Sequence, residues 1–274
     1  RMNSPRGEKL VSATELIRES LSMLYVARWK IITISAPLFL LSLASTVFDR
    51  DITELAREII SYGILIVGII TQLSLVSLAI AYHRGEEELP RESFFRAMGL
   101  VSSDLAIFVL LFFSTFGGYI AFILPGIYLS LALAFAVYVL FEEGKHGYNA
   151  LTRSLFLVKG RWWEVFLQVV AFGIFSSFVS LSTLLLPLFF IIFGLESSLT
   201  FYLFGVLTIG VSSFFLQPLS AFYLYGVYRE LVKLSGEASD IEIISLEKRL
   251  KLLIYIGVLA SISAVVAMLI GKFS

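Results

Sequence analysis

Long apolar segments constrain this chain more than any other feature of its sequence. Charged residues are only 15% of the total and lie in a few short stretches, separated by long apolar runs. A helix needs about 20 apolar residues to cross about 30 Å of hydrocarbon, and only helices and closed barrels satisfy their backbone hydrogen bonds in lipid. The sequence therefore predicts an all-α protein, a polytopic transmembrane helical bundle.

The apolar runs give the number of crossings. They cover residues 31–48, 59–82, 105–141, 165–195, 197–228 and 250–270. The third run is too long for one crossing, and near its middle lies Leu124-Pro125-Gly126. Proline removes a backbone donor and glycine permits a tight reversal, so two helices joined by a minimal turn are expected there. This interpretation predicts seven spans.

The distribution of basic residues favours seven spans and sets their orientation. With seven crossings, 18 of the 21 Lys and Arg residues fall on one side, whereas six crossings would divide them almost evenly. Cytoplasmic loops collect Lys and Arg. The sequence therefore predicts a multi-pass protein of the cell membrane, with a cytoplasmic N-terminus and an extracytoplasmic C-terminus.

This organisation predicts a single integral membrane domain over residues 1–274. Residues 1–29 form a cytoplasmic N-terminus with an interfacial helix, and residues 30–228 form a six-helix core. A cytoplasmic linker at 229–249 leads to the seventh span at 250–271.

A weak internal repeat runs through the six-helix core. Amphipathic segments near residues 15–24, 92–101 and 148–162 precede the first, third and fifth spans, with apolar residues three and four apart. Such segments are expected to lie flat at the cytoplasmic interface. The chain then consists of three units of interfacial helix plus transmembrane hairpin, with one added C-terminal span.

Basic and aromatic residues cluster at the predicted cytoplasmic ends of two spans. Arginine and lysine beside tryptophan at this level suit the headgroups of anionic lipids, although positive-inside anchoring alone would also explain them. The candidate headgroup residues are Arg153, Lys159, Arg161, Trp162, Trp163, Arg28 and Trp29.

The fifth and sixth runs are longer than the hydrocarbon is thick, and each contains a proline. Pro187 and Pro218 are therefore expected to kink their helices, because each deletes a helix hydrogen bond. Kinked helices can line a substrate cavity or simply pack. The three amides in the spans, Gln72, Gln168 and Gln217, could bond between helices or contact a substrate.

Several functional classes find no support in the sequence. The chain has no cysteine, and neither of its two histidines has a second histidine at ligand spacing, so no metal or other cofactor is expected. A net charge of zero gives no case for nucleic-acid binding. The spans contain neither mid-membrane ionisable groups nor a nucleophile motif, so coupled transport and catalysis are not expected.

Small residues on the last predicted span suggest a contact surface. Ser263, Ala267 and Gly271 are four residues apart and permit close approach of another helix. This stripe could bind a protein partner, mediate self-association, or seal the chain's own bundle.

One part of the chain resembles a known family. The stretches PGIY at 125–128, FEEGKHG at 141–147, ALTRSL at 150–155 and LVKGRWW at 157–163 are similar to the glycerophosphoryl diester phosphodiesterase membrane-domain-like or YciC-like proteins of prokaryotes. The resemblance implies a six-helix plan over residues 10–235. The catalytic barrel of the fused members has no counterpart here, so their phosphodiesterase activity does not carry over.

Two functions follow as expectations. The first is a non-catalytic integral membrane scaffold or complex subunit that interacts with membrane lipids at the cytoplasmic leaflet. The second is a passive permease or lipid translocator with a cavity lined by the Pro187 and Pro218 helices. An enclosed cavity that reaches both leaflets, or a cavity that opens laterally to one leaflet, would favour the second, and a tightly filled core the first. A third class, an intramembrane lipid enzyme, would need a polar cluster or a metal near the inner interface.

Overall fold

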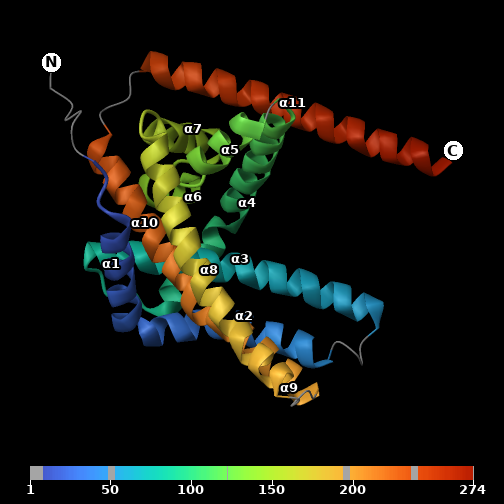
Figure 1. The fold of residues 1–274 in the computed structure, drawn as a ribbon. Coiled ribbons are helices and arrows are strands. Elements are labelled where there is room, and N and C mark those ends of the chain that lie inside the picture. Colours follow the sequence, from blue (N-terminus) through green and yellow to red (C-terminus); the bar gives the residue numbers. More distant parts are fainter. Residues whose placement is uncertain (1–8, 49–52, 122, 194–197, 236–239, 274) are drawn as a thin grey trace. The chain divides into compact units, whose positions relative to one another are not determined.

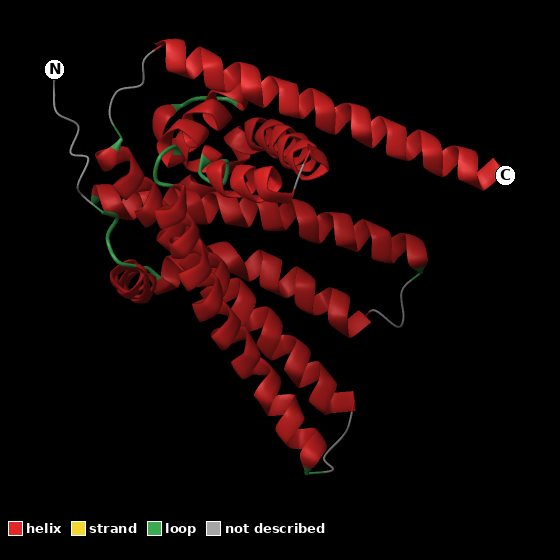
Figure 2. Cartoon of the chain, turned by 45° about the horizontal axis from the view of Figure 1, so that its top comes forward, coloured by secondary structure: helices red, strands yellow, loops and turns green. Residues whose placement is uncertain are grey.

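The computed structural model describes residues 9–48, 53–121, 123–193, 198–235 and 240–273. Every regular element in this part of the chain is helical, and it contains no strand (Figure 2). The prediction of an all-α fold is confirmed. Six segments of the described residues are long and apolar enough to cross a membrane: Arg28–Val47, Glu54–Arg84, Pro90–Ile120, Leu124–Glu143, Trp162–Thr183 and Tyr202–Leu234.

The seventh predicted span falls within the last helix, α11 (Asp240–Phe273). This helix is not among the six membrane-length segments, and it begins in charged sequence well before residue 250. Most side chains beyond Ser263 lie outside the described part of the chain. The seventh crossing therefore stays a prediction.

The helices belong to two compact units. The first is made of Ser102–Leu167 and Val227–Ser274 with the N-terminal segment up to Leu10, and the second of Val11–Val101 and Gln168–Gly226. Three long helices contribute residues to both: α4 (Pro90–Ala121), α8 (Trp162–Ile192) and α10 (Gln217–Leu234).

The third apolar run forms two membrane-length helical segments, as predicted, but the turn predicted between them at residues 124–126 is wrong. Pro125 and Gly126 lie inside α5 (Ile123–Ala132), and α4 ends at Ala121. Proline is tolerated in the first turn of a helix, where its missing N–H would have no partner. Gly126 serves packing instead, because a Cβ atom there would overlap the ring of Tyr119 on α4.

The membrane-length segment Leu124–Glu143 of the first unit is interrupted. α5 ends at Ala132, and α6 (Ala136–Glu143) begins after a turn at 133–135. The break frees carbonyl groups, and the hydroxyl of Ser154 donates to the carbonyl oxygen of Ala132 at 2.7 Å. The donor comes from α7 (Gly147–Val158), so this bond joins α7 to the end of α5.

α7 is the third segment predicted to lie flat at the membrane interface, and other helices of the unit cover more of it than that prediction implied. The segment does form a separate helix, but seven of its residues are buried, and it packs against α5, α6 and α11. Ala150, Leu151 and Val158 expose none of their surface. The small polar residues Thr152 and Ser154 are buried as well. The buried surface of α7 is therefore wider than its apolar stripe.

Two glycines let the backbones of α4 and α11 lie in direct contact. A Cβ atom on Gly117 would overlap the carbonyl oxygen of Leu253, and one on Gly257 would overlap that of Phe113. Close helix crossings of this kind depend on residues without side chains. The sequence analysis proposed contacts for Ser263, Ala267 and Gly271 on the last helix and missed this pair.

In the second unit, α1 (Ala13–Val26) leads into α2 (Arg28–Phe48), which lies beside α3 (Glu54–Arg84) (Figure 1). Ser12 caps α1 by accepting a hydrogen bond from the N–H of Glu15. The first predicted amphipathic segment is thus a separate helix. The second is not, because α4 runs unbroken from Pro90 through residues 92–101 into the third span.

A buried network joins α8, α10 and the segment before α1 in this unit. The side-chain amide of Gln168 donates to the carbonyl oxygen of Val11 at 2.6 Å, and the hydroxyl of Tyr223 donates to Gln168 Oε1 at 2.6 Å. Gln168 therefore makes the interhelical bonds that were one of its two expected roles. Tyr223 also stacks on the ring of Phe172.

Replacing Tyr223 with phenylalanine is expected to destabilise this network. The change keeps the ring but leaves Gln168 Oε1 buried without its donor, a loss of about 1 to 3 kcal/mol. Thermal unfolding of the detergent-purified chain measures it. Tyr255→Phe is the control, because that side chain is 66% exposed. Equal melting of the two variants would contradict the assignment.

Candidate functional site

The helix that contains Pro218 departs from regular geometry in the second unit. α9 (Ser198–Val211) passes into a π-helical turn, η1 (Ser212–Leu216), before α10 begins. The N–H of Gln217 donates to the carbonyl oxygen of Ser212, five residues back. Pro218 has no N–H, so one carbonyl of the preceding turn loses its helix partner. Turns of this kind are frequent at functional sites.

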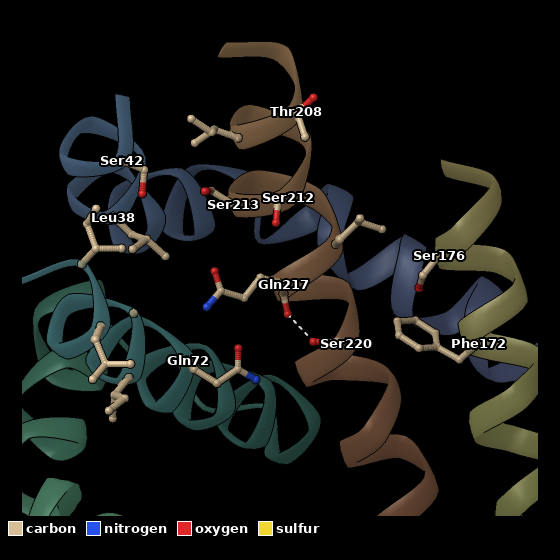
Figure 3. A pocket seen from close by; sticks show the side chains of 16 residues that line it. Leu38, Ser42, Gln72, Phe172, Ser176, Thr208, Ser212, Ser213, Gln217 and Ser220 are labelled. Atoms are coloured by element: carbon tan, nitrogen blue, oxygen red, sulfur yellow. Dashed lines mark hydrogen bonds between the residues drawn. The ribbon is translucent and has the colours of Figure 1, made fainter. Parts of the chain in front are cut away.

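An open cavity of about 860 Å³ adjoins the π turn. Residues of α2, α3, α8, α9, η1 and α10 line it, all within the second unit (Figure 3). Of the described residues that line it, half are polar and none is ionisable. The polar residues are the amides Gln72 and Gln217 and the hydroxyl residues Ser42, Ser176, Thr208, Ser212, Ser213 and Ser220.

The two amides point toward one another in the cavity (Figure 3). Neither the Gln72 nor the Gln217 side chain has a hydrogen-bond partner among the described residues, in contrast to Gln168. An amide in an apolar environment without a partner loses several kcal/mol relative to water. These two groups are therefore expected to bond to water or to a ligand in the cavity.

The hydroxyl groups show the same pattern. Serine in a helix usually donates to a carbonyl three or four residues back, as Ser220 does to Gln217 at 2.7 Å. No such bond, or any other within the described residues, is made by the side chains of Ser42, Thr208, Ser212 and Ser213. The hydroxyl of Ser176 is fully covered and also unpartnered in that part of the chain.

The polar residues lie at a common depth along their helices. A rise of 1.5 Å per residue places Gln72 about 18 Å from Arg84 on α3, and Gln217 about 18 Å from Arg229 on α10. The same count gives about 18 Å from Lys30 to Ser42 on α2. If basic residues mark one membrane surface, this depth lies slightly beyond the middle of about 30 Å of hydrocarbon.

A second hollow continues the cavity between α8 and α9. It measures about 460 Å³ and shares Ser176, Thr208 and Ser212 with the larger cavity. Ser177, Ser180 and Thr183 extend its polar lining along α8. Hydroxyl groups thus line both of these adjoining hollows.

The candidate headgroup residues of the first unit are largely engaged within the protein. Arg153 Nε donates to both carboxylate oxygens of Glu143, at 2.9 and 3.1 Å. Lys145 and Tyr228 bond to the same carboxylate. This arrangement balances the charge of Arg153 with that of Glu143.

The neighbouring candidates differ in exposure. Arg161 lies 3.6 Å from Glu164, and the indole N–H of Trp162 donates to the carbonyl oxygen of Tyr128. Lys159 is exposed, and the Trp163 side chain is 69% exposed. Trp163 and Lys159 thus remain the members of this group most accessible to a lipid.

In the second unit, Arg28 and Trp29 lie at the start of α2. The Arg28 guanidinium lies 4.6 Å from the ring centre of Tyr25, and Trp29 is 71% exposed. The headgroup role of both residues stays a prediction.

The remaining predicted site residues have few described contacts. Pro187 is in the helical part of α8, and its side chain lies outside the described residues, as do the side chains of Ala267 and Gly271. Ser263 is exposed and donates to the carbonyl oxygen of Leu259. Among described residues, no group of three His, Asp or Glu side chains could hold a metal ion.

Only part of this cavity was predictable from the sequence. Gln217 and Pro218 were predicted as cavity residues and Gln72 only as an amide in a span, whereas most of the polar lining was not predicted. The serines were missed because isolated hydroxyls in apolar runs usually bond to their own helix. Their spacing was the available signal, since Ser176, Ser177 and Ser180 recur at helical intervals on one side of α8.

Comparison with known proteins adds no further identification. No family model, no curated protein and no solved structure matches the chain. The resemblance of residues 125–163 to the YciC-like proteins therefore stays a prediction.

Proposed function

We propose that the chain is a lipid translocator, which passively moves an amphipathic ligand across the membrane through the cavity of the second unit. The observation that carries the proposal is the pair of unpartnered amides, Gln72 and Gln217, inside an open cavity between apolar helices. The polar lining offers a path for a headgroup, and the open side leaves room for acyl chains. Passive movement fits a lining without ionisable groups.

The proposal includes an orientation in the cell membrane. The bias of basic residues supports a cytoplasmic N-terminus, and a seventh crossing by residues 250–271 would bring the C-terminus to the opposite side. No catalytic step and no cofactor belong to the proposal.

A cavity-filling variant tests the function. Gly68 lines the cavity, and a Cβ atom there would meet only Leu38, at 3.8 Å, so Gly68→Leu is expected to fold and obstruct the cavity. Full-length protein is reconstituted into phosphatidylcholine vesicles that carry, in both leaflets, a lipid with an uncharged hydroxylated headgroup and a fluorescent acyl chain, and dithionite bleaches the outer leaflet. We expect wild type to expose the inner-leaflet lipid and Gly68→Leu to slow this at least about tenfold.

Gly63→Leu is the matched control. Gly63 lies on the same helix, outside the cavity lining, and has similar space for a Cβ atom, 3.7 Å from Leu41. Its transport is expected to equal that of wild type. Bleaching no faster than in protein-free vesicles would overturn the proposal, as would equal transport by both leucine variants.

A scaffold or complex subunit is the second candidate. The exposed rings of Trp29 and Trp163 favour it, because tryptophan at the end of an apolar helix suits the membrane interface. Stoichiometric co-purification of a protein partner, together with an absence of lipid transport, would support this function over translocation.

A further inference from the structure

The cavity presents an unusual set of hydrogen-bonding groups. Each glutamine amide offers both donors and acceptors, and each hydroxyl can donate or accept. Both amides and the side chains of Ser42, Thr208, Ser212 and Ser213 are free of partners within the described residues, and they line one space (Figure 3). A ligand that fits this lining must carry several groups that both donate and accept.

The charge of the lining limits the ligand further. Among the described residues, no lysine, arginine, histidine, aspartate or glutamate lines either hollow. Bringing a phosphate or an ammonium group into such a space would remove its hydration without an opposite charge to compensate it. Phosphate sites in proteins are usually built with arginine or lysine. The lining therefore selects against ionised headgroups.

The apolar part of the lining indicates that the ligand also has an apolar portion. Leu38, Ile64, Leu65 and Ile69 face the cavity from α2 and α3, and Ile209 and Leu216 from α9 and the π turn. Aliphatic side chains beside a polar centre suit a molecule with a hydroxylated head and hydrocarbon chains.

We infer that the cavity binds an uncharged hydroxylated group, as carried by a neutral lipid of the diacylglycerol type. This inference rests on the proposed function, whose ligand it specifies. A free polyol such as glycerol shares the chemistry of the head but lacks the chains. The uncharged head satisfies the amides and hydroxyls, and the acyl chains occupy the apolar side of the same cavity.

Binding measurements with matched probes test the inference. The detergent-purified full chain is titrated with dioleoylglycerol, dioleoyl phosphatidate or glycerol, and binding is followed by native mass spectrometry and by the shift in unfolding temperature. We expect dioleoylglycerol to bind at least about tenfold more tightly than phosphatidate, which has the same acyl chains. Glycerol alone should bind far more weakly than dioleoylglycerol.

Variants of the two amides connect this preference to the cavity. Gln72→Leu and Gln217→Leu are each expected to weaken dioleoylglycerol binding about tenfold, the effect of one lost hydrogen bond, while Gly63→Leu leaves it unchanged. Gln217→Lys should shift the preference toward phosphatidate, because it supplies the missing positive charge. A folded variant is recognised by its unfolding temperature without lipid.

The outcomes separate the inference from the function on which it rests. Equal binding of the two lipids, or unchanged binding by both leucine variants, would overturn the inference even if vesicles show lipid transport. A preference for dioleoylglycerol without transport would uphold the binding site and overturn the translocator. Tight binding of glycerol would identify a free polyol as the ligand in place of the lipid.

Discussion

Replacing Gly117 with leucine is expected to lower the stability of the chain by about 3 kcal/mol or more. Any Cβ atom at this position overlaps the carbonyl oxygen of Leu253, so α11 would have to move away from α4. Because the obstruction is backbone, no side-chain rotation can relieve it. Thermal unfolding in detergent measures the loss, and faster tryptic cleavage at Lys251 would report the release of α11.

Gly99→Leu is the control for this prediction. Gly99 lies on the same helix, and a Cβ atom there meets nothing within 4 Å. This change should be neutral or slightly stabilising, because leucine favours the helix over glycine. Should Gly117→Leu not fold at all, the smaller Gly257→Ala is expected to show an intermediate loss. Wild-type stability of both Gly117→Leu and Gly257→Ala would contradict the crossing.

Replacing Arg153 with methionine is expected to cost about 2 kcal/mol of stability. The change leaves the carboxylate of Glu143 with Lys145 and Tyr228 but without its two bonds from Arg153 Nε. Both side chains of the pair are about one-fifth exposed, at 20% and 21%, so water compensates part of the loss. Thermal unfolding of the purified chain measures this effect.

A second change distinguishes this internal role from lipid binding. Arg153→Met combined with Glu143→Leu should recover part of the stability, because no unpaired carboxylate remains. Lys248→Met is the charge-matched control at an exposed position and should leave stability unchanged. If Arg153→Met instead melts as wild type and only the amount of co-purified anionic lipid falls, Arg153 acts as a headgroup ligand.

The all-α class could be predicted from the apolar runs. Their lengths are read directly from the sequence and match the number of helical residues needed to cross the hydrocarbon layer. The ends of the helices and the surroundings of each helix were harder to predict from the sequence. Pro125-Gly126 has the composition of a turn, yet its glycine is needed where the ring of Tyr119 lies against α5. The segment before α8 has the periodicity of an interfacial helix, but α7 is buried because α5, α6 and α11 cover it. Both differences arise from tertiary contacts that the local sequence pattern does not contain.

The candidate site shows a similar division. Pro218 and Gln217 could be identified from one short stretch, since proline and a strong amide are unusual within an apolar helix. Gln72 and Gln168 could not be told apart by sequence, because each is a single amide in an apolar run. In the structure, Gln168 bonds to Val11 and Tyr223, whereas Gln72 faces the cavity. Only the position of neighbouring helices decides between these roles.

The π turn has a consequence for the register of the sixth span. A five-residue step holds one residue more than an α-helical step, and each residue of a helix turns about 100° around its axis. If residues 212–216 wound as a regular α-helix instead, α9 and α10 would join as a single regular rod, and everything after the turn would be rotated by about 100° relative to its present orientation. The side chain of Gln217 would then no longer share a direction with Thr208. The one extra residue of the π turn thus sets the rotation of α10 relative to α9, and this rotation allows side chains of both helices to line the same cavity.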